Sequence, residues 1–238
     1  MRLLVKAFLW IISALAAVLL TVLIWFFFYP GGLPDVASLA QYAPDKIGPA
    51  SDSCSHTESV AVPYDSIGAN LRNALSAVEV SENDPGVLTQ TFQVLGNPDV
   101  PHRTMLSLQI SRSMCFARST ILVRNLAELR TAEQLERHFS RHDLFTIYAN
   151  RVYFGENLIG VENASLFLFR KKPADLTVAE AALLAGIPKA PSYYSSVYHP
   201  DRALKRRNEV IDAMVGEHMI SSSEAESAKA SGLGVAVH

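Results

Sequence analysis

One acidic residue of the chain lies where helix periodicity predicts an apolar face. The spacing of apolar side chains predicts a long helix from about Ser119 to Arg141. At about 100° per residue, Glu128 falls about 40° from Arg124 and lies inside the apolar arc. Burying a carboxylate there is costly unless a cation or a hydrogen-bond donor meets it. Two interpretations stay open: a structural Arg124–Glu128 pair, or the floor of a cleft in which a paired acid does chemistry, which we favour.

A second acid, Glu79, lies at the edge of another predicted apolar face. Asp65 or Ser66 can cap a helix that runs to about Val80. The apolar face of that helix consists of Ile67, Leu71, Leu75 and Val78. From the residues alone, Glu79 is a solvated acid at a helix end.

The elements downstream of these acids are two helices joined by loops. Thr177 and Glu180 form a T-x-x-E capping box, which predicts a helix start. The helix is expected over 178–185, with Gly186 leaving it at positive φ and Pro188 preventing its resumption. Further on, Lys205, Arg206 and Arg207 form a charge run of the kind usually found on a solvated face, with anionic head groups as a minor alternative.

The first 29 residues predict a membrane anchor. Ala7 to Tyr29 is a run of 23 residues without a charge. As a helix it measures about 34 Å, enough for a bilayer core of about 30 Å. The run ends in aromatic residues rather than at a small-residue cleavage site, which disfavours a signal peptide. Arg2 and Lys6 precede it, so the N-terminus is expected in the cytoplasm and the rest outside.

Composition limits the remaining possibilities. The chain has 238 residues and a formal net charge of −2, and Arg2 and Lys6 precede the apolar run, so the rest is more acidic still. This balance argues against a nucleic-acid partner, which needs a basic face. We expect a linker or lead-in over 30–62 and one domain over 63–238. Cys54 and Cys115 either pair or are two unrelated thiols.

The most ordered pattern in the chain runs from Tyr148 to Met214. It contains Tyr148-Ala149-Asn150, Tyr153-Phe154-Gly155, Gly160, Ala164, Phe169, Lys171, Asp175-Leu176-Thr177, Glu180 to Gly186, Pro188 to Pro191, His199 to Ala203, Arg206-Arg207-Asn208 and Met214. This run resembles the Y-L-N-x-x-Y-F-G-x-x-x-x-G-x-x-x-A-x-x-x-Y-F-G-K segment, and its continuation, of the peptidoglycan glycosyltransferases (glycosyltransferase family 51).

Two upstream motifs of that family are present with departures. Glu79 falls on the catalytic glutamate of E-D-x-x-F-x-x-H-x-G, but Val80 replaces the second acid, and the Phe and His are absent. The motif G-G-S-T-I-T-Q-Q-L-x-K-N aligns with residues 102–113. Gln109 matches and Arg112 replaces Lys, whereas the double glycine and the first Gln are lost. Without the resemblance, the apolar residues of this segment favour a core or membrane-facing helix surface.

The third motif, R-K-x-x-E, matches Arg124, Asn125 and Glu128. The resemblance implies the polymerisation of lipid II. A sugar hydroxyl attacks the donor's anomeric carbon, with Glu79 as general base and Glu128 as the second acid near the departing diphosphate. The implied substrate-binding residues are Gln109, Arg112, Arg124, Asn125 and Lys171. No metal-ligand set is identified, although a divalent cation at Glu128 is left open.

The resemblance also implies a mainly α, lysozyme-like transglycosylase fold behind one N-terminal transmembrane helix. It implies a location in the bacterial cytoplasmic membrane, with the domain on the periplasmic side. Partners are then lipid II, the nascent glycan strand, the membrane and other cell-wall synthesis proteins. No S-x-x-K transpeptidase signature occurs, so a monofunctional enzyme is expected. Two alternatives stay open: a catalytically impaired protein that binds lipid II or acts as a scaffold, and a lysozyme-like hydrolase.

Overall fold

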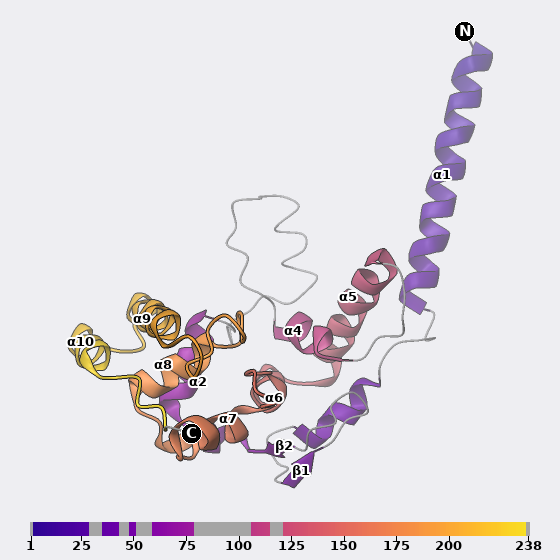
Figure 1. The fold of residues 1–238 in the computed structure, drawn as a ribbon. Helices are drawn as coiled ribbons and strands as arrows, with labels where there is room; N and C mark the ends of the chain where they lie inside the picture. Colours follow the sequence, from indigo (N-terminus) through magenta and orange to yellow (C-terminus); the bar gives the residue numbers. More distant parts are fainter. Residues whose placement is uncertain are drawn as a thin grey trace. The chain divides into compact units, whose positions relative to one another are not determined.

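The structure is a computed structural model that describes residues 2–28, 35–42, 48–50, 59–78, 106–114 and 121–236 (Figure 1). It divides into two compact units, Met1–Leu33 and Pro34–His238. The first unit holds one helix, α1 (Arg2–Phe28). In the part of the chain that the structure describes, no helix combines the length and the apolar character needed to cross a membrane.

The second unit is mainly helical, which confirms the predicted class. Its elements are η1 (Val36–Tyr42), β1 (Gly48–Ala50), β2 (Ser59–Ala61), η2 (Tyr64–Ile67), α2 (Ala69–Val78), α4 (Leu106–Arg112), α5 (Ile121–His138), α6 (Arg141–Arg151), α7 (Val161–Phe169), η3 (Pro173–Asp175), α8 (Val178–Gly186), α9 (Pro200–Gly216) and α10 (Ser222–Ala230). The strands β1 and β2 pair antiparallel, with Pro49 opposite Val60.

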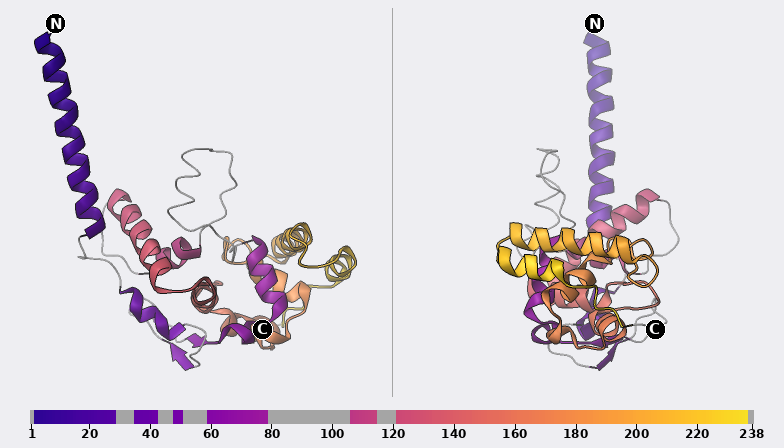
Figure 2. Two further views of the ribbon diagram at one scale, coloured as in Figure 1. Left: turned by 180° about the vertical axis from the view of Figure 1, so that it is seen from behind. Right: turned by 60° about the vertical axis from the view of Figure 1, so that its left-hand side comes forward.

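The alanine-rich helix α8 is the centre of one group of helices. It packs against α2, α9 and α10 (Figure 2). Every residue from Ala181 to Ile187 is buried. The predicted capping box is confirmed: Thr177 Oγ1 accepts from the Glu180 amide, and the Glu180 carboxylate accepts from the Thr177 amide. The predicted positive φ at Gly186 is wrong. This glycine allows close packing instead, because a Cβ there would lie 2.8 Å from Cγ of Arg206 on α9.

The helices α4, α5 and α6 form a second group. α4 packs against both α5 and α6, and η1 packs against α5 and α6. The segment 35–42 lies in the part expected to be a lead-in, yet it contributes Val36, Leu39 and Tyr42 to the hydrophobic core. Asn150 near the end of α6 fixes this segment. Its Nδ2 donates to the carbonyls of Tyr42 and Val62, and its Oδ1 accepts from the Val62 amide.

Two predicted helix boundaries are wrong for local reasons. The helix predicted to start at Asp65 or Ser66 begins only at Ala69, because Gly68 at φ 79° separates η2 from α2. The long helix predicted to run to Arg141 is α5, and it ends at His138. Ser140 starts α6 through a capping box with Asp143.

The interpretation of residues 205–207 as a solvated charge run is also wrong, except at Lys205. Arg206 and Arg207 are buried. The guanidinium of Arg207 donates to the carbonyls of Lys229, Ser231 and Gly232, so it holds the end of α10 against α9. Burial lowers the pKa of Arg207. Helix periodicity places this residue on the inner face of α9, which charge alone does not reveal.

Candidate functional site

A buried carboxylate between two arginines joins α4 to α5. Glu128 is only 6% exposed. Its Oε1 lies 2.9 Å from Nε of Arg124 on the same helix, and its Oε2 lies 3.4 Å from Nε of Arg112 on α4. Ser111 Oγ donates to the Glu128 carbonyl oxygen at 2.8 Å. The predicted Arg124–Glu128 pair is therefore present, and a second cation that the sequence could not pair with Glu128 completes a triad.

Both arginines of the triad stay open to solvent. Their side chains are 54% exposed at Arg112 and 55% at Arg124, whereas the Glu128 side chain is 8% exposed. Each guanidinium meets Glu128 through Nε, so the terminal nitrogens remain accessible to an anion. A planar guanidinium fixed in this way is suited to phosphate oxygens.

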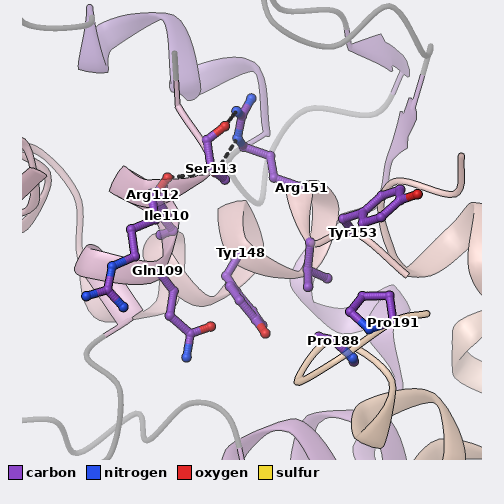
Figure 3. Close-up of a pocket in the computed structure, with 10 residues that line it drawn as sticks. Gln109, Ile110, Arg112, Ser113, Tyr148, Arg151, Tyr153, Pro188 and Pro191 are labelled. Atoms are coloured by element: carbon purple, nitrogen blue, oxygen red, sulfur yellow. Dashed lines mark hydrogen bonds between the residues drawn. The ribbon is translucent and has the colours of Figure 1, made fainter. Parts of the chain in front are cut away.

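One arginine of the triad also lines a cavity of about 370 Å³. The cavity is lined by Gln109, Ile110, Arg112, Ser113, Tyr148, Arg151, Val152, Tyr153, Pro188 and Pro191. Three parts of the chain supply them: α4, the end of α6 with the residues after it, and the loop after α8. Gln109 and Tyr148 project side by side from α4 and α6, with Pro188 and Pro191 across from them (Figure 3).

The cavity wall is braced by Arg151. Its Nη2 donates to the Ser113 carbonyl at 3.2 Å, and its guanidinium carbon lies 5.1 Å from the centre of the Tyr42 ring. This contact joins the end of α6 to the end of α4 (Figure 3). Gln109 and Tyr148 are therefore held by hydrogen-bonded helix ends.

Apart from Lys171, the structure separates the predicted site residues into three groups. Gln109, Arg112, Arg124 and Glu128 belong to the cavity or the triad. Asn125 is exposed on α5 next to Arg124. Glu79, which directly follows the last residue of α2 in the sequence, lies outside the described residues. The structure also does not describe Val80, Cys54, Cys115 and residues 102–105.

The predicted substrate-binding residue Lys171 lies among other partners. Its Nζ contacts both carboxylate oxygens of Glu180, at 2.8 and 3.0 Å, and it does not line the cavity. Burial by itself raises the pKa of Glu180, but hydrogen bonds from Lys171 and Thr177 outweigh it, and the pKa is lowered. The geometry gives Lys171 the role of a brace for the start of α8.

A divalent cation does not fit the described residues around Glu128. Both carboxylate oxygens already face guanidinium nitrogens, and two positive charges would repel a cation there. Among the described residues, no group of three His, Cys, Asp or Glu side chains could hold a metal ion.

Comparisons with known proteins agree with the motif resemblance. The family model described as Transglycosylase matches residues 103–215, which include α4, α5, the residues that line the cavity, and α9 except for Gly216. Residues 103–215 are therefore similar to the transglycosylase domain of this family. The matched segment contains every predicted site residue except Glu79.

The similar proteins are much longer than this chain. Penicillin-binding protein 1F of Bacillus subtilis is 35% identical over 144 residues, which are 60% of this chain and 20% of that protein. Penicillin-binding protein 1A of Vibrio cholerae is 28% identical over 225 residues, 88% of this chain and 27% of that protein. A crystal structure of penicillin-binding protein 1A from Haemophilus influenzae matches with 25% identity and a TM-score of 0.39, covering 60% of this chain and 18% of that one. This chain thus matches between 18% and 27% of the length of these three proteins.

Sequence reasoning missed several residues of the cavity wall. Tyr148, Arg151 and Tyr153 line the cavity but were not named as site residues. Tyr148 and Tyr153 belong to the matched family pattern, so their position in that pattern was the available signal. Arg151 gave no signal, because its partners Ser113 and Tyr42 are distant in sequence.

Proposed function

We propose that the protein is a membrane-anchored peptidoglycan glycosyltransferase that polymerises lipid II into glycan strands. The observation that carries this proposal is the position of Arg112, which lines the cavity while Glu128 holds its Nε. A diphosphate in the cavity would meet the terminal nitrogens of that guanidinium. Arg124, on the other side of Glu128, adds a second positive charge.

The proposed reaction needs a base, and Glu79 is the candidate. The acceptor's C4 hydroxyl attacks the donor's anomeric carbon, and the C–O bond to the diphosphate breaks as the new C–O bond forms. The hydroxyl proton passes to the Glu79 carboxylate. The developing charge of undecaprenyl diphosphate is stabilised by Arg112 and Arg124, which Glu128 positions. Glu128 acts here as a positioning residue, which revises the role of second acid implied by the family resemblance.

The same proposal includes a lysozyme-like arrangement of the helices, an anchor in residues 1–29 and a domain on the outer side of the cytoplasmic membrane. Its support is the uncharged run from Ala7 to Tyr29, which is preceded by two cations, Arg2 and Lys6. A lipid-linked substrate stays in the bilayer, so an anchored enzyme meets it at the surface. Other cell-wall synthesis proteins are proposed partners.

A second candidate function is lipid II binding without turnover. It is favoured by the first motif, in which Val80 replaces an acid and the family's His is absent. The cavity and the arginines would then bind the donor for a partner enzyme.

Lipid II turnover by the full-length protein in detergent distinguishes these candidates. We expect glycan chains from the unaltered protein and none from Glu79→Gln. Glu226→Gln on the exposed side of α10 is the matched control and should polymerise normally. Binding of lipid II without any chains would overturn the polymerase proposal and leave the binding function. Chains from Glu79→Gln would refute the assignment of the base.

A further inference from the structure

The loop between α8 and α9 exposes an aromatic surface that the proposed reaction does not use. Tyr193 is 52% exposed, Val197 40% and Tyr198 66%. We call these three residues, with Arg202 at the start of α9, the tyrosine surface. Exposed apolar and aromatic side chains that gather on one loop can mark a binding site.

Neighbouring residues hold Tyr193 of the tyrosine surface in place before any ligand binds. The Tyr193 amide donates to the Ala190 carbonyl at 2.9 Å. The Arg202 guanidinium carbon lies 4.3 Å from the centre of the Tyr193 ring, and the Tyr193 and Tyr194 rings meet edge to face at 5.0 Å. Because the Tyr193 ring already contacts Arg202 and Tyr194, binding to it loses less conformational entropy than binding to an unconstrained side chain.

The tyrosine surface begins at the edge of the cavity. Pro188 and Pro191 of the same loop line the cavity. Tyr193 follows Pro191 by two residues, so their Cα atoms are at most about 7 Å apart. A polymer that leaves the cavity past Pro191 would meet this surface.

The chemistry of the surface suits a peptidoglycan strand. A tyrosine ring offers an electron-rich face against which the C–H groups of a sugar ring can pack. Its hydroxyl can form hydrogen bonds with sugar oxygens. Arg202 and Lys205 are exposed and can attract the carboxylates of peptide side branches. Asp201 is exposed directly before Arg202 and lowers the net positive charge of this surface, which disfavours an anionic bilayer, because a bilayer is attracted by a larger cluster of cations.

We propose that the tyrosine surface binds the glycan strand outside the cavity, with Tyr193 and Tyr198 against sugar rings and Arg202 toward the peptide carboxylates. This inference rests on the proposed function for the identity of the strand. The surface would retain the product between additions and so lengthen the chains that the enzyme releases.

The test measures binding separately from polymerisation. The probes are β-1,4-linked N-acetylglucosamine oligosaccharides and purified uncrosslinked glycan strands with and without stem peptides, titrated into full-length protein in neutral detergent. Tyr198→Ala and Tyr193→Ala should each weaken binding about threefold to tenfold, whereas Tyr198→Phe keeps the ring and should bind nearly normally. Arg202→Gln should weaken binding only to strands that carry peptides. Leu166→Ala, at a 42% exposed position on α7, is the control and should change nothing.

Each outcome is informative about one proposal at a time. Glycan binding that depends on Tyr198, with no lipid II turnover, would support this inference and overturn the polymerase proposal. Turnover with glycan affinity and chain length unchanged in both alanine variants would overturn this inference and leave the polymerase. Normal glycan binding by the variants, with activity lost only in nanodiscs of anionic lipid, would assign the surface to the membrane and overturn the inference. Circular dichroism of each variant checks that it is folded.

Discussion

Replacing Glu128 by Gln is the change that most directly tests the triad. Glutamine keeps one oxygen that can accept from one Nε, but its amide group would face the other guanidinium, donor to donor. Removing one partner of a fully buried ion pair costs about 3–5 kcal/mol. Here both arginines are more than half exposed, so water replaces much of the lost interaction. We therefore expect Glu128→Gln to lower the free energy of unfolding by about 1–2 kcal/mol.

The assay is a double-mutant cycle, with urea unfolding of the full-length protein followed by circular dichroism. Glu128→Gln is combined with Arg124→Gln and, separately, with Arg112→Gln. The coupling energy should be about 1 kcal/mol for Arg124 and smaller for Arg112, whose Nε lies 3.4 Å away rather than 2.9 Å. Lipid II turnover should fall at least about tenfold in Glu128→Gln at temperatures where the variant is folded, because the arginines lose their positions. Additive effects within about 0.3 kcal/mol in both cycles would refute the triad as described here.

Three further changes and one control substitution test the scaffold. Asn150→Asp loses the Nδ2 donor to two buried carbonyls, so it should lower the free energy of unfolding in urea by about 2–4 kcal/mol. A loss below about 1 kcal/mol would contradict the role of Asn150 in fixing the segment 35–42. Gly160→Ala should destabilise by about 2–4 kcal/mol, because φ is 81° and the new Cβ would lie 2.7 Å from the Asn150 carbonyl oxygen. At Gly216 a new Cβ would have no neighbouring atom within 4 Å, so Gly216→Ala should be neutral or stabilising. Equal losses of stability from the two alanine substitutions would contradict the close packing at Gly160. Lys171→Met should cost about 0.5–1 kcal/mol at neutral pH, since Lys171 is 40% exposed, and leave turnover of the folded enzyme unchanged. Because the folded pKa of Glu180 is lowered, this stability difference should shrink as pH falls below the ordinary carboxyl pKa of 4.5 and through the folded value; a difference that grows in acid would contradict it.

Local sequence patterns predicted where helices occur better than they predicted the residues at which the helices begin and end. The capping box at Thr177 is encoded within four residues, so it was predictable and is confirmed. The boundary between α5 and α6 was equally local, yet the apolar period continued across it and concealed the Ser140 cap. Gly186 shows the opposite limit: its role depends on Arg206 of α9, which no reading of α8 alone could include.

By itself, the sequence predicted the mainly helical class, the resemblance to a transglycosylase domain and a set of candidate site residues. It also placed Glu128 on a buried face, because helix periodicity relates residues one turn apart. Only the tertiary structure decided which charges meet. Arg112 on α4 contacts Glu128 on α5, and Lys171 contacts Glu180 instead of lining the cavity. Arg151 donates a hydrogen bond to Ser113, which is 38 residues away in the sequence. The physical reason is that an ion pair depends on the positions of both partners, and packing between helices sets those positions after the local patterns have formed the helices.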